Sequence, residues 1–220
     1  MSSNKDYEFN ERIHPILINP YLSSSDFEDN INLIKRYNIK NLSTSLNYLS
    51  YVKNAFASYK IKISTLISYP LGDLPNNFAK ELILYAKDAG TDKVEYIPKF
   101  FLLTQNKDEV FALELENISK LDLPITLIFN KRKLDKEIFI KAINISQELG
   151  FENFQFGDGF GKYLEFKEIS EMIKLLGNNN FIKIVGGIKT IKDVINILDT
   201  GANYIGTSYF NDIFQDLKIS

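Results

Sequence analysis

The sequence predicts a (β/α)8 barrel, formed by one domain over residues 1–220. The first observation is that short apolar segments alternate with amphipathic segments along the whole chain, with no linker or low-complexity stretch between them. The second is that eight such units fit this length, and parallel strands covered by helices close naturally into a barrel of that size. A doubly wound open sheet is the alternative, and it is less favoured because no Gly-x-Gly-x-x-Gly motif follows the first apolar segment.

The individual elements follow from the spacing of apolar residues and from the proline, glycine and capping residues that end each segment. The expected strands are 13–19, 41–45, 61–68, 93–97, 124–129, 153–156, 181–185 and 204–206. The expected helices are 25–37, a segment ending near Tyr59, 77–89, 108–120, 135–149, 164–176, 190–200 and 211–217.

The stretch 181–210 has the most informative pattern in the chain. The glycines Gly186 and Gly187 follow one expected strand, and Thr190 with Asp193 three residues later forms an approximate capping box for the next helix. A second glycine turn begins at Gly206, after the next strand. Two glycine turns therefore lie one βα unit apart, as in the phosphate site formed by the loops after the last two strands of many barrels.

Glycine turns let backbone N–H groups converge on an anion, and a neighbouring helix N-terminus adds positive potential. The sequence therefore predicts a phosphate-binding site, although the same glycines could serve only as tight turns. The expected phosphate-binding residues are Gly159, Gly186, Gly187, Lys189, Gly206, Thr207 and Ser208. Lys162 could reach a phosphate or be solvated.

Composition excludes several classes of protein. The net charge of −2 argues against a nucleic-acid-binding surface, and the absence of cysteine rules out disulfides and thiol nucleophiles. With His14 as the only histidine, we expect no metal site and no cofactor. No apolar run reaches membrane-spanning length and the first residues are polar, so we expect a cytoplasmic protein with no membrane partner.

Polar residues inside the expected strands are the candidates for chemistry, because alternate residues of barrel strands point inward. Glu95, Gln155 and Lys183 stand out. A buried charge is costly unless it is paired or functional, so Glu95 and Lys183 could meet across the barrel. The pair is either a structural salt bridge or a lysine for imine chemistry with a carboxylate for proton transfer. His14 is a weaker candidate for a base, and Asp158 either faces a ligand or serves as a turn residue.

Five segments, in the same order, resemble deoxyribose-phosphate aldolases over most of the chain. They are ISTLISYPLGDLP (63–75), DKVEYI (92–97), FENFQFGDGFG (151–161), IKIVGGIKT (182–190) and GANYIGTS (201–208). The glycine–phosphate segments alone are shared by many phosphate-binding barrels, whereas the ordered set is more specific. The resemblance implies a (β/α)8 barrel that cleaves 2-deoxyribose 5-phosphate through a lysine imine.

The chain departs from that family where the chemistry takes place. Gln155 lies at the position of the imine-forming lysine, and an amide cannot form an imine. Lys183 matches the second active-site lysine, Glu95 replaces the proton-shuttling aspartate, and His14 falls at the strand-one aspartate. Lys189 replaces an arginine and keeps the positive charge. The phosphate end of the site is largely retained and the chemical end is largely changed.

Three functions remain open from the sequence. The first is an aldolase-like lyase that forms an imine at Lys183 on a phosphorylated sugar or aldehyde, with Glu95 and Gln155 in the catalytic site. The second is a catalytically inactive relative that binds a phosphosugar or a protein partner, which Gln155 favours. The third is another barrel enzyme, an isomerase or a different imine former, with the same phosphate site. A homodimer is a further expectation.

Overall fold

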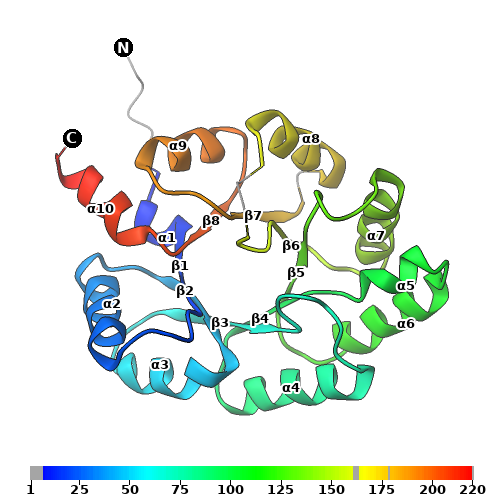
Figure 1. The fold of residues 1–220 in the computed structure, drawn as a ribbon, viewed down its shortest axis with the longest axis horizontal. Helices are drawn as coiled ribbons and strands as arrows, with labels where there is room; N and C mark the ends of the chain where they lie inside the picture. Colours follow the sequence, from blue (N-terminus) through cyan, green and yellow to red (C-terminus); the bar gives the residue numbers. More distant parts are fainter. Residues whose placement is uncertain (1–6, 161–163, 178, 220) are drawn as a thin grey trace.

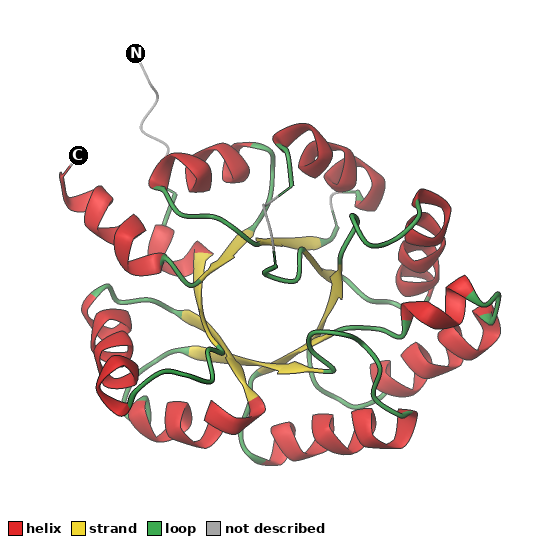
Figure 2. Ribbon diagram, viewed as in Figure 1, coloured by secondary structure: helices red, strands yellow, loops and turns green. Residues whose placement is uncertain are grey.

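The structure, a computed structural model, describes residues 7–160, 164–177 and 179–219. Eight parallel strands form a closed barrel in the order β1 to β8, and β1 pairs with β8 through Ile13 opposite Ile205. The predicted (β/α)8 barrel is therefore confirmed. Figure 1 and Figure 2 show the ring of strands with the helices arranged around its outside. The strands are β1 Ile13–Leu17, β2 Asn41–Ser45, β3 Lys62–Ile67, β4 Lys93–Tyr96, β5 Ile125–Phe129, β6 Asn153–Phe156, β7 Phe181–Val185 and β8 Tyr204–Thr207.

The helices cover the barrel (Figure 2), and all but α1, which precedes β1, and α10, which follows β8, lie in the connections between strands. They are α1 Phe9–Arg12, α2 Ser24–Arg36, η1 Leu46–Tyr48, α3 Leu49–Ala55, α4 Asn76–Asp88, α5 Phe100–Thr104, α6 Asp108–Ser119, α7 Lys136–Glu148, α8 Phe166–Leu176, α9 Ile191–Asp199 and α10 Phe210–Ile219. The described residues contain no helix long and apolar enough to cross a membrane.

The structure departs from the expected helices at three places. Two short helices were not expected: α1, with four residues, and α5, with five. Neither has a side-chain cap at its N-terminus, and both are too short to show a helical repeat of apolar residues. The helical segment expected to reach Tyr59 ends at Ala55, because Phe56 closes α3 as its C-cap.

Helix capping sets the geometry beside the predicted phosphate site. Thr190 is the N-cap of α9, its hydroxyl accepts a hydrogen bond from the Asp193 N–H at 3.2 Å, and the Asp193 carboxylate accepts one from the Thr190 N–H. The predicted capping box is therefore present. It fixes the start of α9 directly after the turn at Gly186 and Gly187.

The hydrophobic core lies mainly between the barrel and the helices, where Phe129, Phe139, Phe154 and Phe156 pack ring against ring. The interior of the barrel, by contrast, contains buried polar side chains: Ser43, Ser64, Glu95, Thr126, Gln155 and Lys183. Because burial of such groups requires partners or a function, the candidate chemistry lies inside this ring.

Candidate active site

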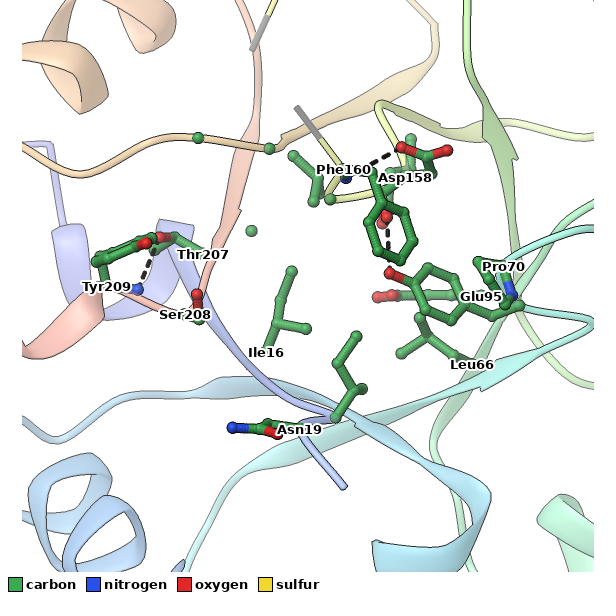
Figure 3. A pocket seen from close by; sticks show the side chains of 18 of the residues that line it. Ile16, Asn19, Leu66, Pro70, Glu95, Asp158, Phe160, Thr207, Ser208 and Tyr209 are labelled. Atoms are coloured by element: carbon green, nitrogen blue, oxygen red, sulfur yellow. Dashed lines mark hydrogen bonds between the residues drawn. The ribbon is translucent and has the colours of Figure 1, made fainter. Parts of the chain in front are cut away.

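A cavity of about 640 Å³ opens at the carboxyl ends of the strands. Its wall includes Glu95 from β4 and Gln155 from β6, together with apolar side chains of which Ile16, Leu66 and Val185 are three. All seven residues expected to bind phosphate also line it: Gly159, Gly186, Gly187, Lys189, Gly206, Thr207 and Ser208. Figure 3 shows Thr207 and Ser208 across the opening from Glu95 and Leu66. Residues from distant parts of the chain thus meet in one cavity.

The loops after β7 and β8 form one side of this cavity. Gly186 has φ 112° and Gly187 has φ 65°, and side chains rarely adopt these left-handed conformations. The Thr207 hydroxyl donates a hydrogen bond to the Ile188 carbonyl at 2.7 Å and accepts one from the Tyr209 N–H at 3.0 Å, so it ties the two loops together. The Lys189 ammonium lies 4.8 Å from the centre of the Tyr209 ring. A cation and two glycine turns therefore lie side by side.

A buried ion pair joins β7 to β4 across the barrel. Lys183 Nζ lies 2.7 Å from Glu95 Oε1 and 2.8 Å from the hydroxyl oxygen of Ser43. The Ser43 hydroxyl donates to the same Glu95 oxygen at 2.8 Å. The Lys183 and Glu95 side chains are only 4% and 2% exposed. The salt bridge considered from the sequence is present, with Ser43 as a third member.

Lys183 contacts Glu95 but does not line the cavity itself. Its Cε would be 2.8 Å from a Cβ atom at position 206, so Gly206 leaves the room that the lysine side chain occupies. Of the ion pair, Glu95 therefore lines the cavity, and Lys183 lies against it.

Gln155 lies beside Lys183 in the register of β6 and β7. Its Nε2 donates to the Gly157 carbonyl at 3.0 Å, whereas its Oε1 is buried and accepts no hydrogen bond from the described residues. Glu95 Oε2 is likewise buried and accepts no hydrogen bond from the described residues. Two residues of the cavity wall thus each have a buried acceptor atom without a donor among the described residues.

The loop after β6 closes another side of the cavity (Figure 3). The Asp158 carboxylate pairs with Lys133 at 2.6 Å, and its other oxygen accepts from the Phe160 N–H at 3.1 Å. Burial alone would raise the pKa of Asp158, but hydrogen bonds from Lys133, Asn130 and the Phe160 N–H outweigh that effect and lower it. Asp158 is therefore a charged residue that fixes the loop.

Tyr69 stacks on Phe160, with ring centres 6.0 Å apart, and its hydroxyl donates to the Asp158 carbonyl at 2.8 Å. Burial, with the Asp158 charge second, raises the pKa of Tyr69 to about 12, so the phenol stays protonated at neutral pH. The two rings form an aromatic rim to the cavity.

His14 lies in β1 and is 7% exposed. Its ring packs at a tilt of 41° against Tyr204 with ring centres 4.8 Å apart, and neither ring nitrogen has a hydrogen-bond partner among the described residues. Burial, then the charges of Lys183 and Lys93, lowers its pKa well below the ordinary value. His14 does not line the cavity. It is a buried neutral side chain, which fits the packing interpretation better than a base.

Three contributors to the site were not singled out from the sequence as functional. Ser43, Lys133 and Phe160 each contact a predicted residue. Only Ser43 carried a signal, as a polar residue in the middle of a short strand. Lys162 lies outside the described residues. No group of three or more potential metal-ligating side chains occurs in the described ranges.

Comparison with known proteins agrees with the fold. No protein-family model matches the chain. It is 24% identical over 205 residues to the deoxyribose-phosphate aldolase of Dictyoglomus turgidum, covering 92% of this chain and 94% of that relative. It is 27% identical over 183 residues to that of Caldicellulosiruptor saccharolyticus, covering 79% and 81%.

Solved structures show the same fold. The tetrameric deoxyribose phosphate aldolase from Aeropyrum pernix superposes with a TM-score of 0.85 at 18% identity, over 96% of this chain and 92% of that one. The aldolase QR15 superposes with a TM-score of 0.88 at 19% identity, over 96% of both chains. The resemblance to the deoxyribose-phosphate aldolases is thus confirmed in sequence and in fold, and the chain is a divergent relative of these proteins.

Proposed function

We propose that the cavity binds a phosphorylated sugar or aldehyde, and that Lys183 forms an imine with its carbonyl carbon to make or break a C–C bond. The observation that carries this proposal is the position of the Lys183–Glu95 pair beside a cavity whose other side is formed by two glycine turns and Lys189. In the proposed complex the phosphate lies against Gly186, Gly187, Gly206, Thr207 and Ser208.

The 2.7 Å contact between Lys183 and Glu95 suits a proton transfer. The Lys183 ammonium gives a proton to Glu95, and the neutral amine adds to the carbonyl carbon. Glu95 returns its proton to the carbinolamine hydroxyl, which leaves as water, so that a protonated imine forms and Glu95 is again a carboxylate.

Glu95 lines the cavity and its Oε2 has no hydrogen-bond partner among the described residues, so this oxygen can then take the proton of a hydroxyl on the carbon β to the imine. As that proton leaves, the Cα–Cβ bond breaks, its electron pair moves toward the iminium nitrogen, and an aldehyde is released. The remaining enamine takes a proton at carbon, and water hydrolyses the resulting imine to release the second product and free Lys183.

The alternative is a catalytically inactive relative that binds a phosphosugar. Two observations favour it: Gln155 occupies the position of the family's imine lysine, and the Lys183 ammonium already donates to Glu95 and Ser43. A carboxylate at this distance stabilises the charged ammonium, whereas only the neutral amine attacks a carbonyl.

One experiment distinguishes the imine-forming enzyme from the inactive relative. The protein is incubated with 2-deoxyribose 5-phosphate and borohydride, and the modified peptides are mapped by mass spectrometry. An imine-forming protein is labelled at Lys183, and Lys183→Met loses that label, whereas Lys120→Met keeps it because Lys120 is an exposed lysine in a surface ion pair. If the label is instead spread over surface lysines while the protein still binds phosphosugar, the result supports the inactive relative.

A further inference from the structure

The floor of the cavity is unusual in the kind of hydrogen-bonding atoms that it offers. Glu95 and Gln155 are each 2% exposed, both line the cavity, and each has one oxygen that no described residue satisfies. A buried acceptor without a donor is costly, so these atoms favour a bound molecule that donates hydrogen bonds to them.

Neither side chain can satisfy its free oxygen by turning over. The Gly157 carbonyl can only accept, so it fixes Nε2 of Gln155 on its own side and leaves Oε1 as the free atom. Oε1 of Glu95 already accepts from both Lys183 and Ser43, so turning the carboxylate only exchanges two equivalent oxygens. The floor therefore presents acceptors in every arrangement.

The two free acceptor atoms favour one kind of ligand group over another. A carbonyl oxygen is only an acceptor and can satisfy neither of these two atoms, whereas a hydroxyl elsewhere on the same molecule can donate to either one. The apolar side chains of Ile16, Leu66 and Val185 line the same cavity and suit a carbon skeleton. Thr207 and Ser208 lie across the opening from Glu95 (Figure 3), so a ligand can reach from one end to the other.

We infer that the cavity selects a phosphorylated polyol: a short carbon chain with a phosphate at one end and hydroxyl donors on Glu95 and Gln155 at the other. This inference rests on the proposed phosphate site and adds a requirement for hydroxyl groups at the far end. A fully hydroxylated sugar phosphate meets this requirement better than a 2-deoxy sugar phosphate, because the 2-deoxy sugar has one hydroxyl donor fewer.

The test compares ribitol 5-phosphate with n-pentyl phosphate by calorimetric titration. The two have the same chain length and phosphate, neither can form an imine, and only the first carries hydroxyl donors. We expect ribitol 5-phosphate to bind at least tenfold more tightly, about the effect of one hydrogen bond to a buried acceptor. Ribose 5-phosphate should likewise bind more tightly than 2-deoxyribose 5-phosphate.

Gln155→Leu is the matched variant, because leucine fills similar space without an acceptor. It should reduce the ratio of the two affinities several-fold while leaving the affinity for inorganic phosphate unchanged. Equal binding of the two esters, or an unchanged ratio in Gln155→Leu, overturns the polyol inference and leaves the phosphate site standing. If neither inorganic phosphate nor either ester binds, the phosphate site fails and this inference fails with it.

Discussion

Lys183 Nζ lies 2.7 Å from Glu95 Oε1, and both side chains are almost completely buried inside the barrel. The Ser43 hydroxyl hydrogen-bonds to both of these atoms and so completes a group of three buried side chains. Removing one member of such an ion pair leaves the other as an uncompensated buried charge, which is more costly than losing the pair as a whole.

The first prediction is that Lys183→Met lowers the free energy of unfolding by about 3–5 kcal/mol, as measured by urea denaturation. The double variant Lys183→Met with Glu95→Leu should recover most of that loss. Lys120→Met is the control, since its pair with Glu116 is exposed and its loss should change stability by less than about 1 kcal/mol. A double variant no more stable than the single one would contradict the ion-pair explanation.

The strands were predictable from local pattern. The bounds of β2, β6 and β7 agree with the expected ones, because each is a short run whose flanking residues disfavour a strand. The Lys183–Glu95 pair was also predictable, since two buried opposite charges inside one barrel need each other. Local pattern could not reveal Ser43 as their partner, because it lies 52 and 140 residues away in the chain.

The rim of the cavity was even less predictable. Tyr69 and Phe160 come from different loops, and Lys133 comes from a third, so only the folded chain shows that they meet at Asp158. The short helix α5 was not predicted from the sequence, for a different reason. It has five residues and no side-chain cap, so it carries neither a helical repeat nor a start signal.

The second prediction concerns pH and His14. Burial first, then Lys183 and Lys93, lowers its pKa in the folded state, so the unfolded chain binds the additional proton. Its contribution to stability is fully present above the unfolded pKa of about 6.5 and is lost as pH falls below it. Between about pH 6.5 and 5, wild type should lose up to about 1.4 kcal/mol per pH unit more than His14→Phe. Parallel stability curves for the two proteins would show that His14 does not titrate in this way.

The third prediction concerns the phosphate site. Millimolar phosphosugar should raise the melting temperature of the wild type, because a ligand at a hundredfold excess over Kd adds about 2.7 kcal/mol of stability. Gly187→Asp should abolish the rise, since it places a carboxylate against the anion. Gly187→Asn is the control: asparagine tolerates the same left-handed backbone at φ 65° without the charge, so it should retain part of the rise. An equal rise in both variants would place the anion elsewhere.

The fourth prediction is that Gln155→Lys creates or increases turnover of 2-deoxyribose 5-phosphate by tenfold or more. Position 155 pairs with Lys183 in the register of β6 and β7, so the new ammonium would lie next to the existing one. Two neighbouring ammonium groups destabilise each other, which raises the fraction of neutral amine that can attack a carbonyl. Borohydride should then trap the substrate on the amine introduced at position 155.

Gln155→Met has similar length without the amine and should give no increase. If Gln155→Lys folds, binds phosphosugar and still shows no turnover, the remaining site lacks more than the one lysine, and the inactive relative is the better account.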